Sequence, residues 1–253
     1  MEKINIDFQV RTIFGIPIAS LTMKETLELI DQAIKEKKTI HHVVVNAGKI
    51  VAMQSDDRLN ESVLGANLIN VDGQAVVWAS KIVGKPLPER VAGIDLMDML
   101  VRLCSEKGYR SYFLGARQEV VEKVVKHYSN TYSEKIIAGY HDGYYNEVEE
   151  ERVAHDIAKS NADILFVAIT SPKKEIFLNK YKHIIKIPFV MGVGGSFDVV
   201  AGVTKRAPLW MQKIGLEWFF RFSQEPKRMW KRYLVGNSKF IMMVLKEKLK
   251  SKY

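Results

Sequence analysis

Short apolar runs and segments of helical periodicity alternate along most of the chain. The runs are rich in Val, Ile, Leu and Phe, as buried strands are, and they occur at "TIFGIPIAS", "HHVVVNA", "NLINVDG", "SYFLGA", "KIIAGY", "DILFVAIT" and "PFVMGVGG". The helical segments are "TMKETLELIDQAIKEKK", "DLMDMLVRLCSEKG", "EVVEKVVKHYSNTY", "EVEEERVAHDIAKS" and "KKEIFLNKYKHI". This alternation predicts a mainly parallel α/β sheet with helices on both faces and a small N-terminal hairpin.

Composition limits the compartment and the number of cores. The chain has 253 residues, 47% of them hydrophobic, which suffices for one core or one core and a small appendage. Its single cysteine, Cys104, lies in an amphipathic segment, so we expect a buried thiol in a reducing compartment. The N-terminus lacks the apolar segment of a signal peptide, and no window has the roughly 18 apolar residues of a membrane span. We expect a cytoplasmic globular protein.

The positive charge is concentrated at one end. Residues 200–253 hold 13 Lys and Arg against 3 acidic residues, a net charge of +10, while residues 1–199 hold 25 against 26, a net charge of −1. Seven aromatic residues between Trp210 and Tyr233 lie among these cations, which a merely solvated basic helix would not require. We therefore predict an α/β catalytic core at 1–199 and a basic, aromatic-rich helical appendage at 200–253. The appendage should face an anionic partner: nucleic acid, lipid headgroups or phosphates.

Polar residues and glycines follow several of the predicted strands. In a parallel, Rossmann-like sheet, ligands bind beyond the carboxyl ends of the strands. Asn46, Asp72, Gly115 and the segment 192–198 fall at such ends. We expect them to converge on one crevice.

Among the strand-end residues, Asp72 has the side chain best suited to acid–base catalysis. It ends the run "NLINV" and is followed by Gly73. An Asp before a helical segment, here "QAVVWASKIV", is a favoured N-cap. A catalytic carboxylate is the other interpretation, and the other strand-end clusters favour it.

The loop "GVGGSFD" is typical of a close backbone approach to phosphate. Gly192, Gly194 and Gly195 could bring amides to a diphosphate, and Asp198 could hold a ribose hydroxyl. The dinucleotide fingerprint fails because Phe197 stands at its third glycine position. A tight strand-to-helix turn is the alternative.

The sequence does not support a metal site. His41 and His42 are adjacent in a predicted strand and point to opposite faces, so they cannot share an ion. There is also no Asp-x-Asp pair of the kind that holds a divalent ion against a diphosphate. We expect no cofactor, and diphosphate binding by arginine, lysine, amides and helix dipoles.

Two longer segments carry a family resemblance. "PERVAGIDLMDML" and "GVGGSFDVVAGVTKRAPLWMQKIGLEWFFRFSQEPKRMWKRY", together with "VDG" and "TSPKKEIF", resemble the WecG/TagA/CpsF family of bacterial glycosyltransferases, glycosyltransferase family 26. The resemblance extends from about Ile13 to Leu234. It implies an inverting, metal-independent transfer of a sugar from a UDP-sugar to a polyprenyl-diphosphate-linked sugar at the inner membrane face. Members build teichoic acid linkage units, common antigen and capsular or exopolysaccharide repeats.

The resemblance also implies roles for individual residues. Asp72 matches the proposed general base, and a carboxylate that takes the acceptor proton fits inversion chemistry. The remaining matches contact the donor sugar, its diphosphate or its nucleotide: Asn46, Arg90, Asp95, Tyr144, Asp198. In the appendage, the segment thought to close over the site and meet the lipid diphosphate contains Arg221, Arg228 and Arg232.

The departures from the family pattern concern the donor sugar. Teichoic-acid members have Thr where this chain has Val44, and Gln where it has Lys174. Both positions are thought to lie near the donor. These departures favour a donor with another hydroxyl pattern or a carboxylate, such as glucose, galactose or a uronic acid, over the N-acetylmannosamine that the resemblance implies. Lys174 either faces that donor or is exposed on a helix.

The appendage also predicts a membrane contact independently of the family. Cations interleaved with Trp and Phe, followed by "KFIMMVLKEKLKSKY", are typical of an interfacial segment on anionic lipid. A nucleic-acid-binding protein would explain this tail but leave Asn46, Asp72 and Asp198 without a task, so we expect no nucleic acid partner. A nucleotide-sugar hydrolase or regulator would use the crevice but not the tail. The sequence is compatible with a homo-oligomer.

Overall fold

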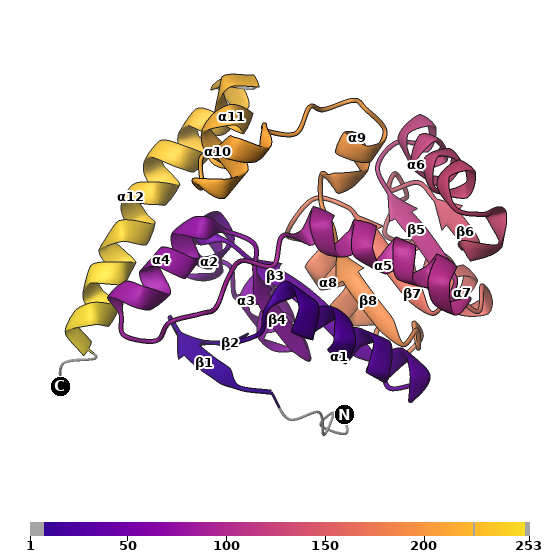
Figure 1. Ribbon diagram of the computed structural model, residues 1–253, viewed down its shortest axis with the longest axis horizontal. Coiled ribbons are helices and arrows are strands. Elements are labelled where there is room, and N and C mark those ends of the chain that lie inside the picture. The colour runs from indigo at the N-terminus through magenta and orange to yellow at the C-terminus, as the bar shows by residue number, and fades with distance from the viewer. Residues whose placement is uncertain (1–7, 225, 251–253) are drawn as a thin grey trace.

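Six strands form one parallel sheet. The computed structural model describes residues 8–224 and 226–250, apart from the side chains of residues 213, 227–229 and 231–235. The strand order is β4-β3-β8-β7-β5-β6 (Figure 1). The strands are β3 (Ile40–Val45), β4 (Leu68–Val71), β5 (Ser111–Gly115), β6 (Ile137–His141), β7 (Ile164–Ala168) and β8 (Phe189–Gly192). Each coincides with an apolar run of the sequence, so the predicted mainly parallel sheet is confirmed.

The predicted N-terminal hairpin is also present. β1 (Val10–Ile13) and β2 (Ile16–Ala19) pair antiparallel. Phe14 and Gly15 form the turn with φ of 54° and 76°. Positive φ at both turn residues matches the right-handed twist of the paired strands.

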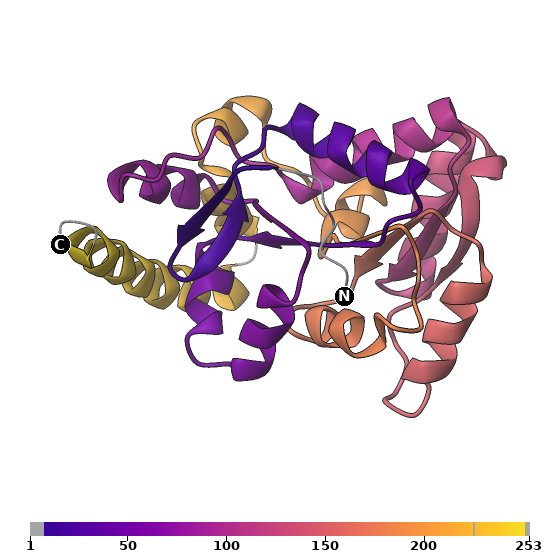
Figure 2. The ribbon, with the colours of Figure 1, turned by 90° about the horizontal axis from the view of Figure 1, so that it is seen from below.

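Helices cover both faces of the sheet (Figure 2). One face carries α1 (Met23–Lys35), α5 (Gly93–Lys107), α6 (Gln118–Thr131) and the short α9 (Ser196–Val200). The other carries α2 (Ala47–Met53), α3 (Asp57–Leu64), α7 (Glu150–Lys159) and α8 (Lys173–Tyr181). α4 (Gln74–Ile82) packs beside the edge strand β4, and a 3₁₀ turn, η1 (Glu134–Ile136), precedes β6. The helical segments of the sequence are confirmed, whereas α2 and α3 were not among them.

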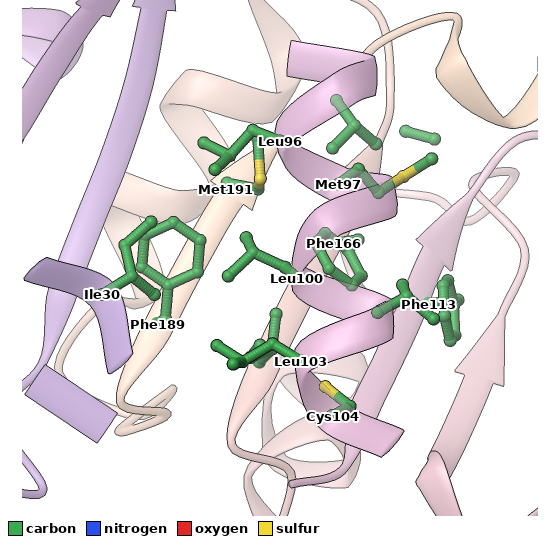
Figure 3. Close-up of a cluster of buried hydrophobic side chains, with 14 of the residues drawn as sticks. Ile30, Leu96, Met97, Leu100, Leu103, Cys104, Phe113, Phe166, Phe189 and Met191 are labelled. Carbon is green, nitrogen blue, oxygen red and sulfur yellow. The ribbon is translucent and has the colours of Figure 1, made fainter. Parts of the chain in front are cut away.

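α5 illustrates how the sequence pattern produces the core. Its buried residues Leu96, Met97, Leu100 and Cys104 recur at helical spacing. Figure 3 shows this face of α5 against Phe113, Phe166, Phe189 and Met191 of the strands. The thiol of Cys104 is buried, as expected, and lies 3.1 Å from the hydroxyl of Ser111.

The C-terminal segment forms α10 (Leu209–Lys213), α11 (Glu217–Gln224) and the long α12 (Pro226–Lys250). Phe240 and Val244 of α12 are buried against the hairpin, α2 and α4. The ring of Phe240 lies 5.5 Å from that of Phe14. The division at residue 199 remains a prediction, and α12 is anchored in the core of the first part. Within the described residues, no helix has both the length and the apolarity that crossing a membrane would require.

Candidate active site

Asp72 directly follows β4, at the carboxyl edge of the sheet. Its backbone N–H donates to the carbonyl of Val45, 2.9 Å away, which joins the ends of β3 and β4. The N-cap of α4 is Gly73, which has no side-chain cap hydrogen bond. The interpretation of Asp72 as the helix cap was therefore wrong, because the helix starts one residue later and the carboxyl group points elsewhere.

Gly73 allows the two strand ends to approach closely. A Cβ atom at this position would lie 3.1 Å from the Cβ of Asn46. Asn46 follows β3, and its side-chain oxygen accepts the backbone N–H of Lys49 at 3.0 Å. Asn46 thus caps α2 and lies beside Gly73, so the predicted convergence of these two strand ends is confirmed.

The carboxyl group of Asp72 faces the N-terminus of α5. It accepts the backbone N–H of Gly93, the first residue of that helix. A Cβ at Gly93 would lie 3.9 Å from Asp72 Oδ2 and from Val44 Cγ2. The N-terminal end of a 15-residue helix favours negative charge, so the fold provides partial compensation for a carboxylate placed here.

Two arginines and a second acid complete the surroundings of Asp72. Arg90 lies in the loop before α5, whose Val91 N–H bonds to the carbonyl of Val71. The guanidinium of Arg90 donates to Glu217 Oε2 at 3.0 Å, and that of Arg221 donates to Glu217 Oε1 at 3.2 Å. Glu217 and Arg221 belong to α11, so the appendage contributes side chains to the surroundings of Asp72.

The pKa of Asp72 is raised to about 6, chiefly by burial. Arg90 and Arg221 lower it and Glu217 raises it, while the hydrogen bond from Gly93 lowers it by a smaller amount. A carboxylate with such a pKa is ionised in most molecules at pH 7 yet accepts a proton more readily than an ordinary aspartate. Asp72 therefore has the properties of a general base.

Asp95 already has a partner of its own. Arg206, in the loop after α9, donates two hydrogen bonds to its carboxylate at 2.6 and 2.8 Å. Asp95 lies in the first turn of α5, two residues after Gly93, whose N–H bonds to Asp72. The ion pair fastens the start of the appendage to the site, and a role of Asp95 toward the nucleotide remains a prediction.

The glycine loop forms a tight connection from β8 to α9. Gly194 has φ of +54°, and Gly195 precedes the first residue of α9. The carbonyl of Asp198 accepts the backbone N–H groups of Val203 and Thr204 at 2.8 and 3.0 Å. The loop is thus a strand-to-helix turn, and its contact with a diphosphate remains a prediction.

Lys174 is buried, so the alternative of an exposed helix residue was wrong. Its ammonium lies 2.9 Å from Glu175 Oε1, and the ammonium of Lys49 lies 2.8 Å from the same oxygen. Burial favours a raised pKa for Glu175, but the two lysines outweigh it and lower the pKa to about 2. Lys49 also donates to the carbonyl of Val44 at 2.8 Å. These three charges connect α8 to the end of β3.

The aliphatic part of Lys174 fills the space that a side chain at Gly192 would need. A Cβ there would lie 2.7 Å from Lys174 Cε. Gly192 therefore has a packing role at the end of β8. The small cavity beside Lys174, lined also by His41 and Val44, has a volume of about 10 Å³, room for one water molecule.

Gly115 and Tyr144 lie at the other half of the sheet edge. Gly115 ends β5, where a Cβ would lie 2.6 Å from the backbone of Ala168. Four strand spacings separate β5 from β4, about 19 Å in a regular sheet. The expected single crevice thus brings Asn46 and Asp72 together but not Gly115. Tyr144 is 74% exposed, and its contact with a nucleotide remains a prediction.

The appendage docks on α4 next to the site. A Cβ at Gly215, between α10 and α11, would lie 2.8 Å from Gln74 Cγ and 3.0 Å from the ring of Trp78. Gly215 has φ of +75°, which favours glycine. Arg228 and Arg232 lie in α12, but their side chains are outside the described residues. Of the three predicted appendage arginines, Arg221 is thus placed at the site.

The sequence missed Glu217, Arg206, Lys49 and Glu175. Three of them lie within segments that carry the family resemblance, and Lys49 follows Asn46 by three residues, but no spacing indicated their partners. Among the described residues, no group of three or more His, Cys, Asp or Glu side chains is placed to hold a metal ion.

Residues 11–253 match the model of the Glycosyl transferase WecG/TagA/CpsF family. The chain is similar to a Bacillus subtilis (strain 168) protein named N-acetylglucosaminyldiphosphoundecaprenol N-acetyl-beta-D-mannosaminyltransferase, with 35% identity over 246 residues, 96% of this chain and 94% of the relative. A Bacillus spizizenii protein of the same name is 40% identical over 187 residues, 74% of this chain and 71% of the relative. The chain therefore belongs to the WecG/TagA/CpsF family of glycosyltransferases.

Proposed function

We propose that this glycosyltransferase moves a hexose from a UDP-sugar to N-acetylglucosamine linked to a polyprenyl diphosphate, with inversion and without a metal ion. The names of the two Bacillus relatives support this acceptor and the class of sugar transferred. The observation that carries the proposal is Asp72: a strand-end carboxylate with a pKa of about 6, beside Arg90 and the N-terminus of α5. Polymer synthesis at the cell envelope is the process in which such a product is used.

The proposed mechanism has one displacement step. Asp72 accepts the proton of the acceptor hydroxyl while the hydroxyl oxygen forms a bond to the anomeric carbon. The bond between that carbon and the donor diphosphate breaks, and its electron pair leaves with UDP. Arg90 stabilises the charge that develops on the diphosphate, as guanidinium groups do on phosphate oxygens. Inversion follows because no covalent intermediate forms.

Val44 and Lys174 bear on the donor sugar. Val44 lies close to Gly93 and Asp72, because a Cβ at Gly93 would lie 3.9 Å from both Val44 Cγ2 and Asp72 Oδ2. The side chain of Val44 has no hydroxyl that could donate a hydrogen bond there. The buried Lys174 adds a positive charge where teichoic-acid members carry Gln. We propose that the donor is N-acetylmannosamine or a related hexose, its uronic acid included, and that these two positions rank the candidates.

UDP release tests the transfer directly. Wild type and Asp72→Asn would be compared with UDP-N-acetylmannosamine, its uronic acid and UDP-glucose, with and without a lipid-diphosphate-linked N-acetylglucosamine acceptor. We expect acceptor-dependent release by the wild type, a decrease of about 10²–10⁴-fold in the variant, and no effect of a metal chelator. Full release by Asp72→Asn would refute the role of Asp72, and release without acceptor would indicate a hydrolase.

We further propose that the protein works at the inner face of the cell membrane. The appendage exposes aromatic and aliphatic side chains among its cations: Leu209, Trp210, Ile214, Trp218, Phe219, Trp230, Ile241, Met242, Leu245, Leu249. Such a surface suits anionic lipid. Co-sedimentation with anionic and neutral liposomes at two salt concentrations tests this, using the full chain and a Trp210→Ser, Trp218→Ser variant. Equal binding to both liposome types would contradict it.

A further inference from the structure

Glu217 connects the two parts of the chain at the catalytic candidate. One carboxylate oxygen accepts from Arg90 of the body, and the other accepts from Arg221 of the appendage. Glu217 and Arg90 are each 15% exposed, whereas Arg221 is 49% exposed. A partly buried carboxylate with one guanidinium on each oxygen fixes the relative positions of both cations.

Each arginine uses only one of its guanidinium nitrogens to bind Glu217. The contact of Arg90 uses Nη1, and that of Arg221 uses Nη2. A guanidinium has five N–H donors in a planar fork, so further donors on each side chain are available for phosphate oxygens. Glu217 can therefore hold both arginines while they bind another anion.

We propose that Glu217 is a positioning residue that holds Arg90 and Arg221 side by side as a clamp for a substrate diphosphate next to Asp72. This inference rests on the proposed function, because it is the diphosphate of the donor or of the lipid-linked acceptor that the clamp would bind. Both substrates present the same group, two linked phosphates with several unprotonated oxygens. Two guanidinium groups held apart by one carboxylate should bind a diphosphate better than they bind a monophosphate.

The charges around Asp72 are consistent with this role. The groups that face it are Arg90 from the loop before α5, the Gly93 N–H of α5, and Glu217 and Arg221 of α11. Glu217 raises the pKa of Asp72, and the two arginines lower it. Loss of the Glu217 charge and displacement of the two arginines would therefore act on the pKa of Asp72 in opposite directions, so the clamp is tested by diphosphate binding.

Diphosphate selectivity is the decisive measurement. Calorimetric titration of the full chain would use two matched pairs of probes: UDP with UMP, and geranyl diphosphate with geranyl monophosphate. The variants are Glu217→Ala, the nearly isosteric Glu217→Gln, and the control Glu247→Gln, which removes a carboxylate of α12 that pairs with Lys85 instead. Circular dichroism confirms folding of each.

We expect the wild type to prefer the diphosphate of at least one pair. Glu217→Ala should lose about tenfold of that preference and Glu217→Gln about threefold, because charge-assisted hydrogen bonds to the arginines are lost. Glu247→Gln should keep it. A loss in the UDP pair identifies the donor as the clamped substrate, and a loss in the geranyl pair identifies the lipid.

Failure of the inference is distinguishable from failure of the proposed function. A wild type without diphosphate preference in either pair would contradict the proposed function and the clamp with it. A wild type with the preference, and Glu217 variants that retain or increase it, would overturn the clamp alone. An increase would mean that Glu217 competes with the diphosphate for the arginines.

Discussion

Replacing Asp72 with Asn should make the protein more stable at neutral pH while it removes activity. Burial raises the pKa of Asp72 from 3.8 to about 6. That difference corresponds to about 3 kcal/mol by which the fold disfavours the ionised carboxylate. Asn has the same shape, stays neutral, and its oxygen can still accept the N–H of Gly93. The cost of the charge should therefore be recovered in the variant.

The sign of the pH dependence follows from proton binding. Between about pH 4 and 6 the folded protein holds a proton on Asp72 that the unfolded chain has lost, so the free energy of unfolding falls as pH rises through this window. The advantage of Asp72→Asn should be about 3 kcal/mol at pH 7.5 and about 1 kcal/mol at pH 4.5. At pH 7.5 this corresponds to a rise in Tm of about 6–12 °C for a chain of this length.

Urea unfolding followed by tryptophan fluorescence at the two pH values measures the difference. Asp156→Asn, an exposed carboxylate on α7, is the matched control and should change stability little at either pH. Equal or lower stability of Asp72→Asn at pH 7.5 would refute the reasoning, since the carboxylate would then be stabilised by its neighbours rather than strained by burial.

Three further predictions concern the charges between α8 and β3. Glu175→Gln should lower the free energy of unfolding by about 3–5 kcal/mol, because two buried ammonium groups lose their shared carboxylate; a small loss in urea unfolding would contradict this. Gly192→Ala should cost about 1–3 kcal/mol through its contact with Lys174, and adding Lys174→Ala should restore part of it, as a double-mutant cycle would reveal. Lys174→Gln should move the donor ranking toward N-acetylmannosamine in competition assays, and an unchanged ranking would remove Lys174 from donor selection.

The fold was largely predictable because its strands are buried on both faces. Every residue of β3, β4, β5, β7 and β8 is buried, so each appears in the sequence as a mainly apolar run between polar segments. α2 and α3 were missed for a related reason. They are only 7 and 8 residues long, too short to establish a helical period, and α2 starts from the same Asn46 that marks a strand end.

The candidate site was predictable only where chemistry coincides with a strand end. Asp72 and Asn46 satisfy that rule, since β3 and β4 are neighbours in the sheet. Gly115 satisfies it too, yet strand order, which no local pattern encodes, places it at the far half of the edge. Helix boundaries are equally hard to resolve to one residue, and this is why Asp72 was a candidate for the cap of α4, a position that Gly73 occupies.

The sequence did not predict the roles of Glu217 and Arg206 because their partners are distant along the chain. Glu217 and Arg206 acquire meaning only through partners more than a hundred residues away, Arg90 and Asp95. The pairing is reciprocal: Arg90 of the body is a second cation for Glu217, beside Arg221 of the appendage, and Arg206 of the appendage is the cation for Asp95 of the body. Each part therefore lacks one of the partners that these acids have in the folded protein. Because unpaired, partly buried charges are costly, docking of the appendage and assembly of the site should occur together. The net charge of +10 in residues 200–253 therefore does not reveal that docking depends on an acidic residue of this segment, Glu217.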